Sequence, residues 1–327
     1  MSFPKILAIV STVLFFAIAV AAFFKQGSDE PAEATSVATR TEISPSQETK
    51  ALVVANPKPI LQPTIPGLSG SGREPPADVD RTKELFNKRE PRLPIVETIV
   101  YKSRVPWQKG RPAWLSDYAN HYRTSRHFIA RGRNGKPDYT KQDVADGDRF
   151  NVYNPAVNFS FYLLVDTTRS KMWLFYINQD TNQHVLIKTY PVGLGRVDNT
   201  SPSGLLTPYG KYQLGSKTAV YKPKVMGTYN GKRAEMITVF GTRWIPFCKE
   251  ISGCTASPAG FGIHGVPWIL GPSGELVEKN DLLGKYESDG GVRLSTADIE
   301  ELYAIITLRS AEIEIVKDYF DAQIAEN

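Results

Sequence analysis

Cysteine and histidine are scarce in this chain of 327 residues. The two cysteines and four histidines show none of the C-x-x-C or H-x-x-x-H spacings that bind metal ions in proteins. The sequence therefore predicts no metal site, and we expect no cofactor. In an exported chain, a pair as close as Cys248 and Cys254 favours a small disulfide on a surface loop.

A strong charge of either sign is also missing. The formal net charge is +5, and the charged residues are spread along the chain. Proteins that bind nucleic acids gather positive charge into a patch or stripe. The sequence therefore predicts no nucleic-acid partner.

A long apolar run is present at the amino terminus. The segment from Ile6 to Phe24 has 19 residues without a charge, between Lys5 and Lys25. This is about the length that crosses a bilayer as a helix, so we expect residues 1–25 to be a membrane anchor. A cleaved signal peptide is the alternative, because Ala19-Val20-Ala21 is a possible cleavage site.

Residues 26–95 are rich in Pro, Ser, Thr, Ala and Glu, with no sustained helical or strand period. This composition predicts a disordered or extended tether. As a coil of about 70 residues it would span on the order of 45 Å, enough for a membrane-anchored domain to search a layer above the bilayer. We expect one short polar helix within it, from Asp80 to Lys88.

Residues 96–154 have the pattern of a small α+β domain. A strand-like segment, ETIVYKS, opens it, and Arg149–Tyr153 reads as a closing strand. Between them, apolar residues from Ala113 to Tyr122 fall on one face of an expected helix.

Strand signals dominate residues 158–320. Turn residues separate the segments at short spacing, which predicts a mostly β sandwich or barrel. The clearest helix runs from Asp298 to Leu308, with Thr296 as its expected N-cap. The expected strands are FYLLVD, KMWLFYI, HVLIKTYPVG, KYQLG, AEMITVF, GFGIHG and AEIEIV.

Two motifs in this mostly β region point to chemistry. The first is Ile263-His264-Gly265, and the second is Ser288-Asp289-Gly290-Gly291-Val292-Arg293-Leu294, which begins 24 positions after His264. A histidine held by a strand beside a small residue suits a general base. Two adjacent glycines allow the close backbone approach that presents an N–H group to a carbonyl oxygen.

Together these motifs resemble the L,D-transpeptidase (YkuD-type) family of cell-wall enzymes. In that family a His-Gly strand is followed by Ser-His-Gly-Cys-(Ile/Val)-Arg, and the similarity continues in order from Phe161–Asp166 to the helix with Leu302-Tyr303. The resemblance implies acyl transfer between peptidoglycan stem peptides. A cysteine thiolate attacks a stem-peptide carbonyl, and an amine of a neighbouring stem takes the acyl group.

The chain departs from the family pattern at two positions. Gly291 stands where the family has its nucleophilic cysteine, and Asp289 stands where it has a second histidine. Glycine has no side chain, so the cysteine mechanism cannot run at position 291.

Three hypotheses follow from this departure. The family favours an active enzyme, but the domain could instead be a catalytically inactive member that binds peptidoglycan or serves as a regulatory scaffold. Catalysis could also persist with a relocated nucleophile, Cys254 or Cys248. Finally, Ser288 could act as the nucleophile with His264 as its base.

The resemblance assigns roles to a limited set of residues. Ser288 and Arg293 also have structural readings, a turn cap and an ion pair. Trp244 and Phe247 are expected to form an aromatic roof over the site. The expected catalytic positions are His264, Ser288, Asp289, Gly291, Arg293 and, if relocated, Cys254; the expected substrate-binding residues are Gly265, Gly290, Trp244 and Phe247.

Residues 96–154 resemble a divergent LysM module, through Trp114, Asn134 and the Asp146-Gly147-Asp148 exit. LysM modules bind glycans that contain N-acetylglucosamine; an unrelated α+β domain that positions its neighbour is the alternative. The expected protein is a single-pass protein of the bacterial inner membrane with its domains in the periplasm or cell envelope. Its expected partners are peptidoglycan stem peptides and glycan, and the membrane.

Overall fold

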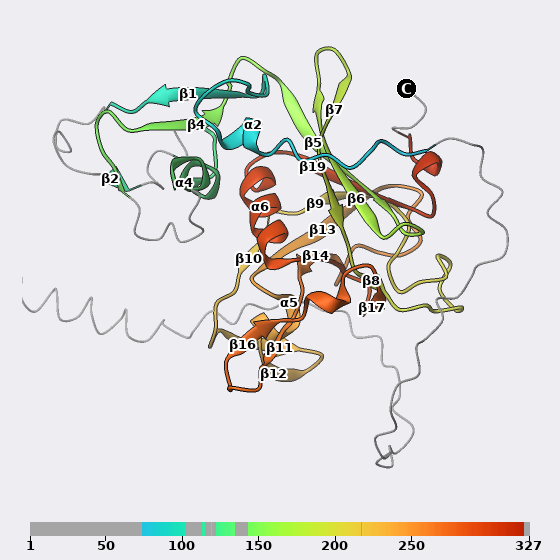
Figure 1. Ribbon diagram of the computed structural model, residues 1–327. Coiled ribbons are helices and arrows are strands. Elements are labelled where there is room, and N and C mark those ends of the chain that lie inside the picture. Colours follow the sequence, from blue (N-terminus) through green and yellow to red (C-terminus); the bar gives the residue numbers. More distant parts are fainter. Residues whose placement is uncertain are drawn as a thin grey trace, which may run out of the picture. The chain divides into compact units, whose positions relative to one another are not determined.

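The computed structural model describes residues 74–102, 113–114, 119, 122–134, 143–216 and 218–323 (Figure 1). The expected anchor and residues 26–73 of the expected tether lie outside these ranges. Within the described ranges, no helix is long and apolar enough to cross a membrane.

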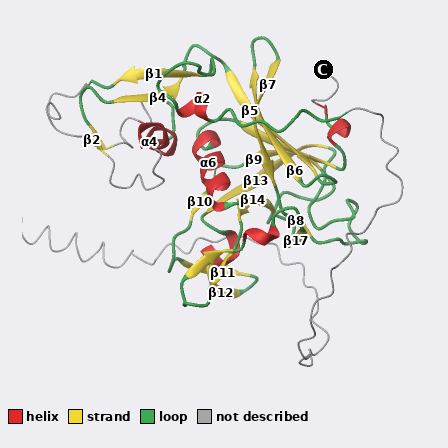
Figure 2. Cartoon of the chain, in the orientation of Figure 1, coloured by secondary structure: helices red, strands yellow, loops and turns green. Residues whose placement is uncertain are grey.

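The fold is mostly β, as expected, and its main sheet curls into a half-barrel. Figure 2 shows its strands in yellow. In spatial order they are β18 (Val292–Leu294), β14 (Gly262–Gly265), β13 (Arg243–Ser252), β9 (Gly210–Leu214), β19 (Ala311–Val316), β5 (Phe159–Asp166), β6 (Lys171–Asn178) and β7 (Gln183–Pro191), with β10 (Ala219–Val220) also paired to β13.

Most neighbours in this sheet are antiparallel, but β19–β5 and β14–β18 are parallel. The last strand, β19, inserts between β9 and β5, so the C-terminal strand of the domain lies in the middle of the sheet. β5 is buried along nearly its whole length, which explains its near-continuous apolar sequence, FSFYLLVD. The parallel β14–β18 pair brings the two sequence motifs side by side.

Smaller elements surround the sheet. Two hairpins, β11–β12 and β15–β16, project from it, and β17 pairs with β8 in parallel. The bounds are β8 (Leu194–Gly195), β11 (Met226–Tyr229), β12 (Lys232–Glu235), α5 (Ile237–Phe240), β15 (Trp268–Leu270), β16 (Leu276–Glu278), η2 (Asn280–Leu282), β17 (Tyr286–Ser288) and η3 (Tyr319–Asp321).

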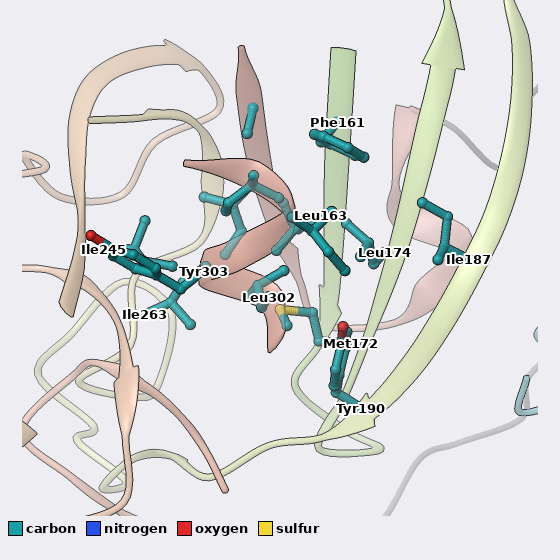
Figure 3. Close-up of a cluster of buried hydrophobic side chains, with 14 of the residues drawn as sticks. Phe161, Leu163, Met172, Leu174, Ile187, Tyr190, Ile245, Ile263, Leu302 and Tyr303 are labelled. Carbon is teal, nitrogen blue, oxygen red and sulfur yellow. The ribbon is translucent and has the colours of Figure 1, made fainter. Parts of the chain in front are cut away.

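The expected helix is α6 (Thr296–Ile306), which packs on β13 and β14. Its cap is Ser295 rather than Thr296, because the Ser295 hydroxyl accepts the hydrogen bond from the Asp298 N–H. Leu302 and Tyr303 enter the core beside Ile245 and Ile263 of the sheet (Figure 3). Each fully buried side chain of this size contributes roughly 1.5–3 kcal/mol by leaving water.

The region before the sheet has its own strand pair. β1 (Val96–Val100) and β4 (Arg149–Tyr153) are antiparallel, with Val96 opposite Tyr153, as the opening and closing strand signals predicted. Also present are α4 (Arg126–Asn134) and the short pair of β2 (Ala113–Trp114) with β3 (Asp143–Val144). Most of the helix expected at 113–122 lies outside the described residues, so the LysM-like module stays a prediction.

This region packs on the last turn of α6. The Ser125 hydroxyl donates to the Ala304 carbonyl at 2.9 Å, and the Tyr153 hydroxyl donates to the Ile305 carbonyl. These bonds satisfy carbonyls that the end of a helix leaves without partners. The Phe128 and Tyr153 rings belong to the same buried cluster as Phe161.

Two segments differ from expectation. Residues 74–95 were expected in the tether, yet Asp80 bridges Lys188 of β7. The short helix expected between Asp80 and Lys88 is present as α2 (Lys83–Phe86). The segment AEMITVF was expected to be a strand, but β12 ends at Glu235 and α5 begins at Ile237. A short apolar run of this kind cannot be assigned by periodicity, since strand and helix both bury it.

Candidate functional site

His264 lies at the centre of the candidate site, on β14 between β13 and β18. It is opposite Trp244 of β13 and Arg293 of β18. Only 5% of His264 is exposed. Three strands therefore fix the position of one buried imidazole.

Hydrogen bonding fixes the tautomer of that imidazole. Nδ1 lies 2.9 Å from the Gly265 carbonyl oxygen, which can only accept, so Nδ1 carries the proton. Burial and, second, the charge of Arg293 lower the pKa of His264 to about 3. The ring is therefore neutral at pH 7, and its Nε2 offers a lone pair.

Nε2 points at Gly291. A Cβ atom built on Gly291 would lie 2.5 Å from Nε2 and 2.7 Å from Cδ2 of His264. The Gly291 backbone lies outside the left-handed region, so its conformation does not require glycine. The imidazole occupies the space that a side chain at position 291 would take.

Ser288 holds the loop that precedes Gly291. Its hydroxyl donates to the Gly291 carbonyl at 2.7 Å and accepts the Gly290 N–H at 3.1 Å. Gly290 has a φ of 114°, a conformation that side chains other than glycine rarely adopt. The proton of the buried Ser288 hydroxyl is thus directed at a backbone carbonyl and not at His264.

Asp289 joins three segments next to this loop. Its Oδ1 accepts from Arg196 Nη2 at 2.7 Å, and its Oδ2 accepts from the Tyr229 hydroxyl at 2.8 Å. Arg196 follows β8, and Tyr229 ends β11 of the β11–β12 hairpin. Burial, then Asp289, raises the pKa of Tyr229, so the phenol keeps its proton.

Arg293 lies next to His264, and its backbone exchanges hydrogen bonds with Gly193. Its buried Nε has no hydrogen-bond partner within the ranges that the structure describes. Burial lowers the pKa of the guanidinium, and the carboxylate of Asp289 opposes that shift. Arg293 is therefore a partly desolvated cation with a donor to spare.

Aromatic rings surround one side of His264. Ring centroids of Trp244 and Phe240 lie 5.7 and 5.4 Å from that of His264, and Tyr229 meets Phe240 at 5.4 Å. Trp244 is thus beside the imidazole as expected. Phe240 and Tyr229 were missed, because the sequence around Phe240 reads as a strand and Tyr229 lies in no recognised motif.

Two other expected binding residues are part of the packing. Phe247 is 4% exposed and stacks on Tyr212 with centroids 5.2 Å apart, so it belongs to the core and not to a roof. A Cβ on Gly265 would lie 3.2 Å from Cγ2 of Ile299. Gly265 therefore lets α6 approach the sheet, and its carbonyl orients His264.

The two cysteines are free, so the expected disulfide is wrong. Cys248 approaches Gly215 beyond one end of β9, whereas Cys254 lies against Gly210 at the other. Five strand residues span roughly 16 Å, well beyond the Cα separation of about 4.4–6.8 Å that a disulfide needs.

Cys254 is also remote from His264. Its Sγ donates to the Lys211 carbonyl at 3.2 Å, at the end of β13 where Ser252 pairs with Lys211. His264 pairs with Trp244 at the opposite end of β13. Allowing for the bulges, the strand separates them by on the order of 20 Å. Within the described part of the chain, no cluster of three or more metal-binding side chains occurs.

The fold and motifs agree with one known family. Residues 160–315 match the protein family described as YkuD, the L,D-transpeptidase catalytic domain. This region is a YkuD domain. No curated protein matched the chain.

Solved structures similar to this chain include two from different bacteria. Bd1075 of Bdellovibrio bacteriovorus is 20% identical, with 50% of each chain covered and a TM-score of 0.35. The helical cell shape determining protein Pgp2 of Campylobacter jejuni is 14% identical, with 49% of each chain covered and a TM-score of 0.33. The chain thus spans about half the length of both structures.

The site of the YkuD domain offers a distinct set of chemical groups. It has a neutral imidazole with a free lone pair, a guanidinium, a glycine loop and three aromatic rings. These groups can hold a peptide with carbonyl and carboxylate groups. A covalent acyl transfer also requires a nucleophile within reach of the base, and position 291 supplies none.

Proposed function

We propose that this YkuD domain binds peptidoglycan stem peptides and forms no acyl-enzyme with them. It would act in cell-wall remodelling as a binding or regulatory member of the family. The observation that carries the proposal is the close approach of His264 Nε2 to Gly291, where a Cβ would lie at 2.5 Å. The base faces a position that has no side chain.

The other candidate nucleophiles give little support to catalysis. The Ser288 proton is committed to the Gly291 carbonyl, and Cys254 lies at the far end of β13. A water molecule activated by His264 is a further route. However, an imidazole with a pKa of about 3 is a weak base at neutral pH, and the ring itself lies against Gly291.

Stem-peptide binding is supported by the family and by the groups that remain. Active L,D-transpeptidases act on stem peptides, and this domain keeps the strand pair that carries both motifs. The φ of Gly290 and the Ser288 hydrogen bonds hold the loop in one conformation. Arg293 and the rings of Trp244 and Phe240 lie beside it. A preorganised site of this kind lowers the entropy lost on binding.

The remaining expectations belong to the same proposal. The domain would work in the bacterial cell envelope, held to the inner membrane by residues 1–25. Residues 96–154 would hold glycan as a LysM-like module while the YkuD domain holds the stem.

Binding and turnover can be separated in one experiment. The purified chain is mixed with disaccharide tetrapeptides; calorimetry measures binding, and mass spectrometry measures products after prolonged incubation. We expect saturable binding without crosslinked dimers or shortened stems, in the wild type and in Cys248→Ala and Cys254→Ala alike.

Two outcomes would overturn the proposal. A dimer or a shortened stem that is lost in Cys254→Ala or Ser288→Ala would identify an active enzyme. Absence of binding at millimolar tetrapeptide would remove the stem peptide as ligand.

A further inference from the structure

The carboxylate of Asp289 is held in the way proteins hold a bound carboxylate. One oxygen accepts from a guanidinium at 2.7 Å and the other from a phenol at 2.8 Å. Arginine forks and hydroxyls are the usual donors for carboxylate ligands. Here the two donors come from separate segments, the strand-end residue Arg196 and the β11–β12 hairpin residue Tyr229.

A third donor lies close by and is unused. The buried Nε of Arg293 has no hydrogen-bond partner in the described ranges, and Asp289 acts on the charge of this guanidinium. A buried donor without a partner is costly. The arrangement therefore has more donors for an anion than the single carboxylate of Asp289 uses.

The contact is also weak enough to exchange. Arg196 is 61% exposed and Asp289 52% exposed in their side chains. Ion pairs this exposed contribute little to stability. A ligand carboxylate that reached the same donors could therefore displace Asp289.

The surrounding charge favours an acidic ligand. Lys224, Lys232 and Arg233 are exposed on or next to the hairpin, and the backbone N–H of Lys224 donates to the nearby carboxylate of Glu235. Near Arg293, the negative charges of Asp289 and Glu287 are partly offset by the positive charge of Arg196.

We propose that Asp289 is an internal occupant of a carboxylate site formed by Arg196, Tyr229 and Arg293, which the carboxylate of an acidic stem peptide displaces. This inference rests on the proposed stem-peptide function and names the groups that would recognise the ligand. Displacement also transfers the Tyr229 hydroxyl from Asp289 to the ligand, and so breaks the link between the β11–β12 hairpin and the loop that carries Asp289. Asp289 thus limits ligand affinity and holds the hairpin in place.

The replacement of Asp289 by a ligand carboxylate is tested by comparing the affinities of two ligands that differ only in their carboxylates. Calorimetry compares a disaccharide tetrapeptide with the same compound whose carboxylates are converted to carboxamides. Asp289→Asn should bind the acidic form about three- to tenfold more tightly than wild type, because the competing charge is gone. The affinity for the amidated form should not change.

Two further variants identify the cause of any gain. Glu287→Gln removes a neighbouring charge that is also exposed and forms no part of the bridge, and it should not reproduce the gain. Asp289→Asn combined with Arg196→Gln should lose the gain, because a ligand-binding donor is then missing. An equal gain in Glu287→Gln, or no gain in Asp289→Asn, would overturn the proposal.

The rate of limited trypsin digestion measures how firmly the β11–β12 hairpin is held, and no ligand is needed. Cleavage after Lys224, Lys232 or Arg233 should accelerate in Asp289→Asn and not in Glu287→Gln. Unchanged cleavage would refute the bridge. If neither peptide binds any variant, the stem-peptide function fails together with the ligand named here, and trypsin still decides whether Asp289 holds the hairpin.

Discussion

The two ends of β13 hold complementary parts of a covalent chemistry. At one end, Trp244 faces His264, whose neutral imidazole presents Nε2 to a glycine. At the other end, the Cys254 thiol donates to the Lys211 carbonyl. At the His264 end, position 291 supplies no nucleophile, and at the other end the Cys254 thiol is hydrogen-bonded to a backbone carbonyl.

The difference shows which properties of a catalytic site depend on the sheet and which depend on a single residue. Strand register, the histidine tautomer and the Gly290 turn are all in place, because backbone pairing and packing determine them. The nucleophile depends on one side chain at position 291. On the proposed function, this site keeps its geometry without the covalent chemistry.

The largest expected effect comes from restoring a thiol at the His264 end. Gly291→Cys should become acylated by a carbapenem, because its Cβ points at the lone pair that would take the thiol proton. The imidazole must move by about 1 Å to reach ordinary van der Waals contact. Intact-mass spectrometry should detect one adduct per chain, against none for wild type.

Gly291→Ala is the matched control, since it adds the same Cβ without a thiol. Its loss of stability measures the cost of moving the ring, and it should form no adduct. A folded Gly291→Cys protein with an accessible thiol and no adduct would contradict the assignment of position 291.

The next largest effects come from two β13 substitutions, which distinguish a residue that packs in the core from one that contacts the ligand. Phe247→Ala should lower the free energy of unfolding by about 3–5 kcal/mol, because it removes a buried ring that stacks on Tyr212. Trp244→Ala should cost less stability, since this ring is partly exposed, but should weaken tetrapeptide binding roughly two- to tenfold. Urea unfolding and calorimetry measure the two quantities, and the opposite pattern would show that Phe247 contacts the ligand.

The smallest expected effect is on the pH dependence of stability. His264 has a pKa of about 3 when folded and an ordinary value of 6.5 when unfolded, so below pH 6.5 the unfolded chain binds one more proton. This contribution is complete above pH 6.5 and declines as the pH falls toward 3.

Between pH 6 and pH 5, the wild type should therefore lose about 1 kcal/mol more stability than His264→Gln. His127, whose pKa is also lowered to about 3 by burial, is present in both proteins and cancels. Parallel urea titrations at the two pH values measure the difference. An equal loss of stability in the two proteins would show that the His264 ring can be protonated without unfolding.

The strands were predictable where the pattern was strong. β5, β6 and β19 carry long apolar or alternating runs, and the structure has them close to the expected bounds. β13 was not recognised, because Pro246 lacks the N–H group that a central strand needs. Its pairings shift register within the strand, and no local rule predicts such irregularities.

Only those residues of the candidate site that lie within the two sequence motifs were predictable. His264, Ser288 and Arg293 were expected in one site. The β14–β18 pairing brings the strands of His264 and Arg293 together, and Ser288, at the end of β17, joins them through its hydrogen bond to the Gly291 carbonyl. The partners of Asp289 were not predictable, because Arg196 and Tyr229 lie 93 and 60 positions away in the sequence. Phe247 was expected over the site from the resemblance alone, and the structure buries its ring against Tyr212 instead.

The contacts of Ser125 and Tyr153 with the end of α6 bear on how this protein could exchange parts during evolution. The YkuD match begins at residue 160, yet the preceding region supplies donors to the Ala304 and Ile305 carbonyls and rings to the shared core. Recombination at that boundary would leave two helix carbonyls and an apolar cavity without their partners. We therefore expect the YkuD domain to be less stable when the preceding region is replaced or removed.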